Sequence, residues 1–415
     1  MISRNTPWNA QRMGTAALAI ATSLMIVACG GESNQTASGG SPTAVATPTP
    51  TATQTTAATP AETANAIVRR SLSLDLTQLA NYAAPTLPAF YDNTVAALDN
   101  APNNDPVDDA IATLGRVLFY DTTLSFNDTT SCSSCHQQGA GFDDPGRFSR
   151  GFAGGLTDRH AMRLGNVRYF DDGEMFWDRR ADSLEDQATQ PILHPVEMGW
   201  QDNGGLAALF TKMQGRDYYP ALFTFVYGDA AITQTRIERA LAHFQRAMIS
   251  SDSRWDRAYA QVFNPNGPNR NLNAPLPGFS ASENRGRQLF MTNPGQGGAG
   301  CARCHRPPTF ALDGNSRSNG LDAGETTVFK SPSLKSIGRS SFFMHDGRFS
   351  TLRQVVIHYD RGIQNGPALD NRLRQGNQPL RLNLSDADID ALVDFMLTLD
   401  DTTLAADPRF SNPFL

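Results

Sequence analysis

Apolar side chains recur at helical spacing in several parts of this chain. Ile237, Leu241, Phe244 and Met248 are separated by four, three and four residues, which places all four on one face of a helix. Between such stripes the chain is rich in Gly, Pro, Asn and Asp, which are typical of loops and turns, and strand-like alternation is sparse. The pattern predicts a mainly α-helical fold with long loops.

Two more helices can be placed from signals at their starts. Asp105 can cap a helix whose first position is Pro106 and whose apolar face runs through residues 111–118. Ser385 can begin another helix, whose apolar face is formed within residues 389–396.

One short segment occurs twice. Residues 115–119 read Gly-Arg-Val-Leu-Phe, and residues 286–290 read Gly-Arg-Gln-Leu-Phe, at an offset of 171 residues. Each copy closes a predicted helix and precedes a Cys-x-x-Cys-His sequence, at residues 132–136 and 301–305, whose offset is 169 residues. Matching elements at nearly the same offset indicate two related domains.

The Cys-x-x-Cys-His spacing is that of covalent haem c attachment. Two thiols reach the two vinyl groups of one porphyrin, and the next residue places its imidazole on the iron. Zinc knuckles would stand about 15–20 residues apart, and thioredoxin-like motifs would need neither histidine. We expect two covalently bound haem c groups, attached through Cys132, Cys135, Cys301 and Cys304 and ligated by His136 and His305.

The first 29 residues have the pattern of an export signal. Arg4 and Arg12 supply a positive start, and residues 14–28 form an apolar stretch that is short for a membrane span. The end of this stretch resembles a bacterial lipobox, which implies cleavage before Cys29, lipidation of its sulfur and a membrane anchor. An ordinary signal peptide with an incidental cysteine is the alternative. Both interpretations place the protein outside the cytoplasm, in the periplasm or at the cell surface.

Composition divides the rest of the chain. Residues 30–70 are dominated by Thr, Ala, Pro and Ser at their start and predict a disordered tether, because such a segment cannot bury enough apolar surface to fold. The remainder suits two domains, an N-terminal haem domain at 71–270 and a C-terminal haem domain at 271–415. The net charge of −6 gives no indication of nucleic-acid binding.

Several segments around the haem sequences resemble a known family. They are Leu-Phe-Tyr-Asp at 118–121, Phe-Trp-Asp-Arg-Arg-Ala at 176–181, Glu-Asp-Gln at 185–187, Pro-Val-Glu-Met-Gly at 195–199 and His-Asp-Gly-Arg at 345–348. Over roughly residues 110–399 the chain resembles the bacterial di-haem cytochrome c peroxidase and MauG superfamily. The resemblance implies two cytochrome-c-like domains packed against each other and a reaction with hydrogen peroxide.

The resemblance also implies roles for individual residues. The N-terminal haem, ligated by His136, would be the reactive one, with Glu197 and Gln187 on its far side to move protons and orient peroxide. Trp177 matches the tryptophan that lies between the two haems and relays electrons, although plain core packing is the alternative. His194 lies three residues before Glu197 and could share its cavity, or be an ordinary loop residue.

The chain departs from many members of the family at both haems. Phe152 stands where a loop histidine caps the reactive iron, so we expect that haem to be open or water-bound. At the second haem, Tyr359 stands where a methionine is common, and tyrosine is found there in MauG-type members. A phenolate ligand stabilises ferric iron, so this haem should have a low potential. His358 and Met344 are the competing ligands.

A third departure concerns calcium. The family often holds a structural Ca²⁺ between the domains through one Asn side chain and backbone carbonyls. His160 stands at the position of that Asn, and imidazole is a poor ligand for a cation that prefers oxygen. The resemblance therefore gives Ca²⁺ only weak support here, through carbonyls near Ser340 and Phe342.

Three functions are compatible with these residues. The first is a peroxidase that reduces hydrogen peroxide with electrons from a small cytochrome c or cupredoxin. The second is a MauG-like oxidase that uses peroxide equivalents on a protein side chain or other organic substrate, which Tyr359 favours. The third is a non-enzymatic electron carrier, against which Glu197, Gln187 and the missing capping histidine argue. Related peroxidases are often homodimers, which leaves the oligomeric state open.

The Phe152 substitution leads to a spectroscopic prediction. Because phenylalanine cannot ligate iron, the ferric protein should contain one high-spin or water-bound haem before any reduction. The absorption spectrum of the ferric protein measures this, and a spectrum of only low-spin, six-coordinate haem would contradict it.

Overall fold

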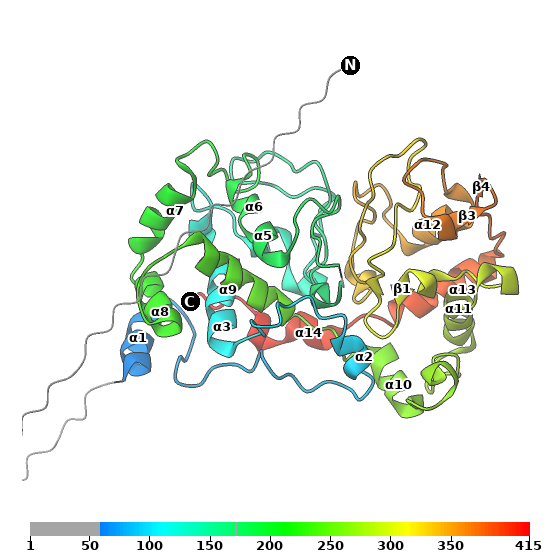
Figure 1. The fold of residues 1–415 in the computed structure, drawn as a ribbon, viewed down its shortest axis with the longest axis horizontal. Helices are drawn as coiled ribbons and strands as arrows, with labels where there is room; N and C mark the ends of the chain where they lie inside the picture. The colour runs from blue at the N-terminus through cyan, green and yellow to red at the C-terminus, as the bar shows by residue number, and fades with distance from the viewer. Residues whose placement is uncertain (1–58, 171) are drawn as a thin grey trace, which may run out of the picture. The chain divides into compact units, whose positions relative to one another are not determined.

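The computed structural model describes residues 59–170 and 172–415, and it is mainly helical, as the sequence predicts (Figure 1). Two small antiparallel pairs, β1–β2 and β3–β4, are its only ladders of named strands within those residues. The elements are α1 (Pro60–Val68), α2 (Asn93–Ala96), α3 (Asp109–Tyr120), α4 (Cys132–Cys135), α5 (Leu184–Ala188), α6 (Gln190–Leu193), α7 (Gly205–Gln214), α8 (Tyr218–Tyr227), α9 (Gln234–Arg246), α10 (Arg254–Val262), α11 (Ala281–Met291), β1 (His305–Arg306), β2 (Ala311–Leu312), α12 (Leu352–Ile357), β3 (Arg374–Gln375), β4 (Gln378–Pro379), α13 (Asp386–Leu397) and α14 (Thr402–Ala406).

The predicted signal peptide and lipobox, residues 1–29, lie outside the described residues, as does most of the predicted tether. Among the helices that are described, none is both long enough and apolar enough to cross a membrane.

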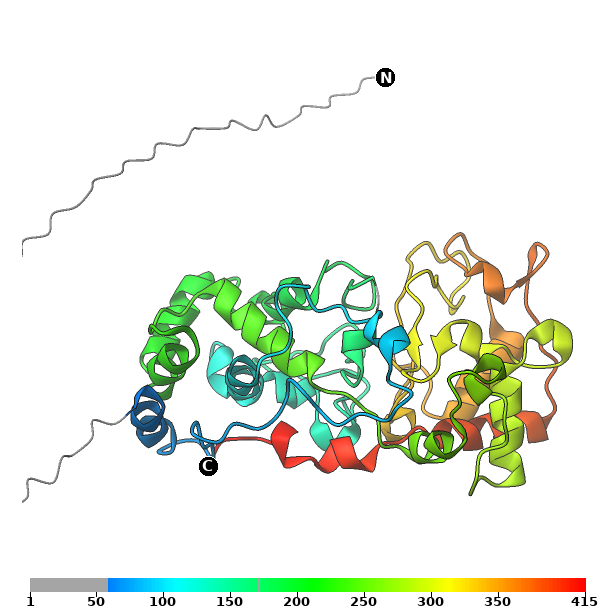
Figure 2. The ribbon, with the colours of Figure 1, turned by 60° about the horizontal axis from the view of Figure 1, so that its bottom comes forward.

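Two large hydrophobic clusters form the interior. One contains the buried faces of α3, α8 and α9, with side chains of α1 and α7. The other contains the buried faces of α10, α11, α12 and α13. Figures 1 and 2 show α3, α8 and α9 in one half of the described chain and α10 to α13 in the other.

The repeated Gly-Arg-x-Leu-Phe segment has the same structural task in both halves. In α3, a Cβ atom on Gly115 would lie 1.9 Å from the carbonyl oxygen of Ala240 in α9 and 2.8 Å from the Cβ of Phe244. In α11, a Cβ atom on Gly286 would lie 1.8 Å from the carbonyl oxygen of Ala391 in α13 and 2.8 Å from Cβ of the phenylalanine four residues later. Each glycine therefore lets two helix backbones touch where they cross, and the two crossings are equivalent.

The start of α3 differs from the sequence prediction. Asp108 caps the helix, because its side chain accepts the backbone N–H groups of Ala110 and Ile111, each at 2.9 Å. Asp105 instead pairs with Arg239 of α9. The prediction was wrong because two aspartates lie near the helix start, and only the contact with α9 decides which one caps.

The ordered part of the chain also begins earlier than residue 71. Helix α1 lies inside the predicted tether, and its Ala64 and Val68 are buried in the first hydrophobic cluster. Thr59 and Glu62 form a capping box at its start. These few apolar residues are stabilised by packing against α8, a distant contact that composition does not reveal.

The two clusters do not divide the chain at residue 270. Trp255 and Tyr259 of α10 belong to the second cluster, although they precede the predicted boundary. Leu404 of α14 and Phe410 belong to the first cluster, so the C-terminal segment returns to the N-terminal half. Each half is thus assembled from separate stretches of the chain.

The helix crossings give a stability prediction. Gly115→Ala or Gly286→Ala should each lower the free energy of unfolding by about 3 kcal/mol, because the added methyl group forces two packed backbones apart. Denaturant unfolding followed by circular dichroism measures the loss. Gly139→Ala is the control, because a Cβ there meets no atom within 4 Å. Alanine variants at both crossings within about 0.5 kcal/mol of the parent would contradict the role of the glycines.

Candidate functional site

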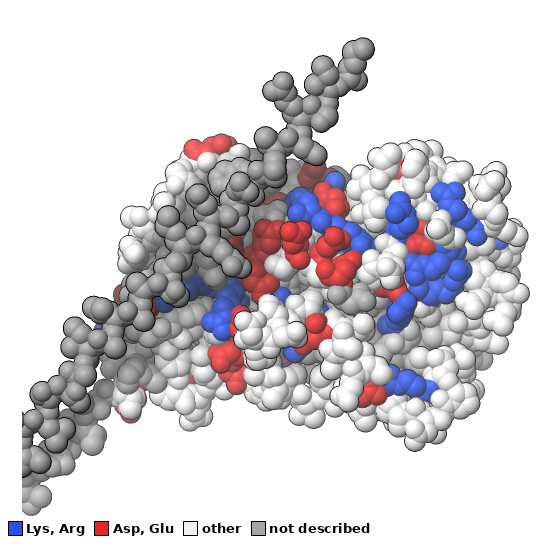
Figure 3. All heavy atoms as spheres, in the orientation of Figure 1, with Lys and Arg blue, Asp and Glu red and all other residues white. Residues whose placement is uncertain are grey.

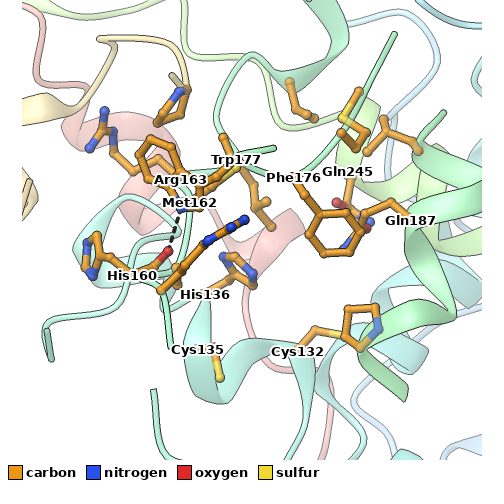
Figure 4. A pocket seen from close by; sticks show the side chains of 18 of the residues that line it. Cys132, Cys135, His136, His160, Met162, Arg163, Phe176, Trp177, Gln187 and Gln245 are labelled. Carbon is orange, nitrogen blue, oxygen red and sulfur yellow. Dashed lines mark hydrogen bonds between the residues drawn. The ribbon is translucent and has the colours of Figure 1, made fainter. Parts of the chain in front are cut away.

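The first Cys-x-x-Cys-His sequence lies at one side of a cavity of about 430 Å³. Cys132 and Cys135 begin and end the single turn of α4, and His136 follows directly. All three line the cavity, and Figure 4 shows them together, with Phe176 and Gln187 further along its wall. The spacing therefore brings two thiols and one imidazole to one cavity, as haem c attachment requires.

The imidazole of His136 is held in an orientation suited to a metal ligand. Its Nδ1 lies 3.2 Å from the carbonyl oxygen of Phe142, to which an Nδ1–H can donate. This bond leaves Nε2 without the proton and free to ligate. Burial lowers the pKa of His136, which favours the neutral form that binds metal.

Glu197 and Gln187 line the same cavity as His136. Gln187 comes from α5, and Glu197 comes from the loop after α6. Burial raises the pKa of Glu197 to about 7, although 29% of its side chain is accessible. A carboxyl group with this pKa can both accept and release a proton near neutral pH, so the cavity contains an acid–base group.

His194 acts on the backbone around Glu197. Its Nδ1 lies 3.3 Å from the backbone nitrogens of both Val196 and Glu197, and it accepts their N–H groups. An Nδ1 that accepts cannot also donate to the Glu197 carboxylate, which lies 3.7 Å away. Burial lowers the pKa of His194, in keeping with a neutral ring. His194 therefore positions the Glu197 loop.

Phe152 supports the same loop from its other side. Its backbone N–H donates to the carbonyl oxygen of Glu197 at 2.9 Å. Its ring covers Gly199, where an added Cβ would lie 2.4 Å away, and meets Phe126 edge-on at 6.3 Å. The sequence shows that Phe152 cannot be a ligand, but only the structure shows this packing role.

The second Cys-x-x-Cys-His sequence lies at a smaller cavity of about 170 Å³. Cys301, Cys304 and His305 line it, together with Tyr359 and Met344. Burial lowers the pKa of His305 to about 4, so its ring is neutral at neutral pH. Its Nδ1 is buried without a hydrogen-bond partner within the described residues.

The three competing ligands of the second site have different surroundings. Tyr359 lies on a π-helical turn, His358–Gly362, that continues α12, and its hydroxyl group is 3.4 Å from Nδ2 of Asn319. The same Nδ2 is 3.3 Å from the sulfur of Met344. His358 instead places Nε2 3.2 Å from the carbonyl oxygen of Asn319, and it is absent from the lining of the described cavity. This geometry favours Tyr359 and Met344 over His358.

The four described cysteines are free thiols. Burial raises the pKa of Cys132 and of Cys301 to about 12. A redox-active or zinc-binding cysteine needs a lowered pKa, because the thiolate is the reactive form. The thiols therefore suit thioether bonds to haem better than redox chemistry of their own.

Trp177 lies in the wall that the two cavities share, because it lines both. Its Nε1–H donates to the carbonyl oxygen of His160 at 2.7 Å, as the dashed line in Figure 4 shows. On the side of the second cavity its ring meets His345 edge-on at 6.3 Å, and His345 stacks on Phe329 at 3.8 Å. The indole is thus fixed between the two sites.

A buried charged cluster joins the loops of the two halves. Asp143 is fully buried, with Oδ1 3.2 Å from Nε2 of His160 and Oδ2 3.7 Å from Nη1 of Arg163. Ser340 donates to the same carboxylate and accepts from Arg163. The His160 ring, which stands where the family has the calcium-binding Asn, is thus engaged by Asp143 and by the carbonyl of Arg147.

Three polar residues of the site escaped the sequence analysis. Gln245 of α9 lines the first cavity while nearly buried, and it lies four residues after Leu241 of the apolar stripe, which was a usable signal. Buried Lys330 lies in the shared wall, with Nζ 2.6 Å from the carbonyl oxygen of Glu174, and Asn319 contacts two possible ligands. Neither of these has a local sequence signal.

Two cavities, each lined by a Cys-x-x-Cys-His sequence and joined by one wall, define a c-type cytochrome with two sites. Comparison with known proteins agrees. Residues 109–262 match the family model of di-haem cytochrome c peroxidases. The chain is 29% identical to the methylamine utilization protein MauG of Methylorubrum extorquens over 314 residues, 72% of this chain and 80% of the relative. It is 27% identical to the cytochrome-c peroxidase IdrP1 of a Pseudomonas species, over 75% of this chain and 87% of that one.

A solved structure is similar as well. The crystal structure of a MauG-like protein associated with microbial copper homeostasis matches with a TM-score of 0.61 and 27% identity, over 80% of this chain and 99% of that chain. The chain belongs to the di-haem cytochrome c peroxidase and MauG superfamily. It is an oxidoreductase of the peroxidase type, and its family implies two c-type haems.

The second cavity gives a test of the ligand assignment. Tyr359→Phe should convert the ferric spectrum of the second haem from a six-coordinate to a five-coordinate or water-bound form, because the ring remains but the oxygen ligand is lost. Met344→Leu is the matched control and should leave the spectrum unchanged. A methionine–iron charge-transfer band in the near infrared of the parent protein, lost in Met344→Leu, would contradict the assignment.

Proposed function

We propose that this protein is a di-haem c-type peroxidase that reduces hydrogen peroxide with electrons from a small redox protein. The observation that carries the proposal is the composition of the first cavity. It contains a neutral histidine beside two attachment cysteines, and also Glu197, an acid–base group with a pKa of about 7. An electron carrier would need no such group.

The chain's own residues account for the proton movements of this reaction. Hydrogen peroxide, two electrons and two protons give two water molecules. Bound at His136, a haem c would supply the iron that binds peroxide and passes electrons to it. Glu197 takes the proton from one peroxide oxygen and returns it to the other, which makes water the leaving group. The amide of Gln187 supplies a hydrogen bond that orients peroxide in the cavity.

Electrons would enter at the second site, where His305 and Tyr359 ligate. Trp177 lies in the wall between the two cavities, so we assign it as the relay that shortens the transfer between them. The two haem domains, 71–270 and 271–415 in sequence, are thus proposed to differ in task, with the C-terminal half receiving electrons and the N-terminal half using them.

A MauG-like oxidase is the second candidate, and Tyr359 is the observation that favours it. A phenolate stabilises ferric iron and higher oxidation states, which would let oxidising equivalents remain in the protein until an organic or protein substrate is oxidised. Relatives of both names match this chain to a similar extent.

The site of action follows from the haems. Haem c is attached outside the cytoplasm, so we propose an extracytoplasmic protein, anchored through lipidated Cys29. A homodimer remains the proposed oligomeric state on the resemblance alone. Ca²⁺ has no part in the proposal.

Adding one equivalent of hydrogen peroxide to the ferric protein tests the two candidates. If the protein is a peroxidase, peroxide should be consumed over many cycles only when a reduced small redox protein is present. If it is an oxidase, one equivalent should produce a spectral change that persists for minutes without donor. No spectral change and no peroxide consumption would overturn both.

The acid–base group leads to a pH prediction. Burial raises the pKa of Glu197 to about 7, so its proton-accepting form increases as pH rises through 7. The rate constant of the peroxide step should rise with pH, with a midpoint near 7, and then level off. Glu197→Gln should slow the step by at least about 100-fold and remove the titration. Stopped-flow absorbance with excess peroxide measures the rate.

Asp158→Asn is the matched control for this test. Asp158 lines the same cavity, and its charge raises the pKa of Glu197. Its neutralisation should move the midpoint to lower pH and leave the plateau rate nearly unchanged. A pH profile that is the same in the parent and in Glu197→Gln would remove Glu197 from this role.

A further inference from the structure

The segment around the second cavity is basic, although the chain as a whole is acidic. Residues 301–381 contain twelve Lys or Arg and six Asp or Glu, whereas the rest of the chain contains twenty-three and thirty-five. Figure 3 shows the largest group of basic residues over the half that contains α11 to α13, and a group of acidic residues over the other half. The two halves therefore present different charge to a partner.

Burial increases this difference at the surface. Three of the six acidic residues of the segment are buried, namely Asp313, Asp360 and Asp370. Four of its arginines are exposed, namely Arg306, Arg317, Arg361 and Arg381. The negative charges are thus withdrawn into the interior while the positive charges remain accessible.

Five arginines gather next to the second Cys-x-x-Cys-His sequence, and we call them the basic rim. They are Arg303, Arg306, Arg317, Arg372 and Arg374. Arg303 lies inside the haem sequence and Arg306 directly after it, while Arg317 lines the second cavity.

Contacts among these residues hold the basic rim together. Nη1 of Arg372 donates to the carbonyl oxygen of Arg303 at 2.7 Å, and Nη2 pairs with Asp370 at 2.8 Å. Arg306 pairs with Asp313. Arg374 donates to Asn365 and to the carbonyl of Gly366, which are uncharged. Five guanidinium groups therefore face two buried carboxylates, and the rim carries a net positive charge.

We propose that the basic rim is the docking surface for the electron donor, and that this donor is a small redox protein with an acidic face around its own redox centre. The proposal rests on the proposed function, in which electrons enter at the second site. Charge of opposite sign raises the rate of productive encounter by about 10- to 1,000-fold at low ionic strength and selects among partners. A donor with a basic face would be repelled at this entry point.

The test uses the haem-loaded protein in the absence of peroxide. Stopped-flow absorbance follows reduction of the second haem by two reduced c-type cytochromes, one strongly acidic and one strongly basic. The acidic donor should react at least about tenfold faster at low ionic strength, and the difference should shrink as salt screens the charges. Faster reduction by the basic donor would overturn the proposal.

Charge reversal on the rim identifies the surface. Arg317→Glu combined with Arg374→Glu should lower the second-order rate constant for the acidic donor by about tenfold at low ionic strength. Arg317→Gln with Arg374→Gln should give a smaller loss in the same direction, if the reversed protein folds poorly. Arg70→Glu, an exposed residue of the other half, is the matched control and should change the rate by less than about twofold. Equal rates for the double variants and the parent would overturn the proposal.

A separate measurement keeps the two proposals distinguishable. Peroxide consumption with a small uncharged chemical reductant tests the peroxidase function without any docking. Failure there would count against the peroxidase, whereas the donor-reduction rates would still decide whether the basic rim receives an acidic partner.

Discussion

The buried carboxylate of Asp143 is the group on which the arrangement of both sites depends. It follows Phe142, whose carbonyl oxygen holds the His136 imidazole. It lies against His160, whose carbonyl oxygen accepts the Trp177 indole N–H. Through Arg163 and Ser340 it also reaches the loops of the second half. A buried charge is stable only when it is paired and hydrogen-bonded, so this carboxylate fixes the positions of all its partners at once.

The two sites differ because of the side chains beyond their histidines. The first cavity is roomy and contains a buried acid, while the second is smaller and contains a phenol and a thioether close to its histidine. The same attachment sequence therefore serves two purposes. The loop that holds Glu197 is itself positioned by His194 and Phe152, so the acid is fixed by contacts from both sides.

Much of the fold could be predicted because its signals are local. The stripe on α9 and the cap of α13 follow from spacing, and the repeated segment correctly indicated two equivalent helix crossings around Gly115 and Gly286. The cap of α3, the helix inside the predicted tether and the return of the C-terminal segment could not be predicted. Each of these depends on contacts between residues far apart in the chain.

The candidate site shows the same division. The attachment cysteines and histidines follow from their spacing alone. Glu197, Gln187 and Trp177 could be singled out only through resemblance, and the structure places all three at the first cavity. Their roles remain proposals. The buried Lys330 and the contacts of Asn319 join distant loops, so no pattern in the sequence points to them.

The central claim is that Trp177 connects two unequal sites. The most direct test starts from protein whose second haem alone is reduced, adds peroxide and follows oxidation of that haem by stopped-flow absorbance. Trp177→Phe keeps an aromatic ring in the shared wall but lacks the indole. The account predicts that oxidation of the second haem slows at least about tenfold in this variant, while the first haem reacts with peroxide at the parent rate. Equal oxidation rates in the two proteins would contradict it.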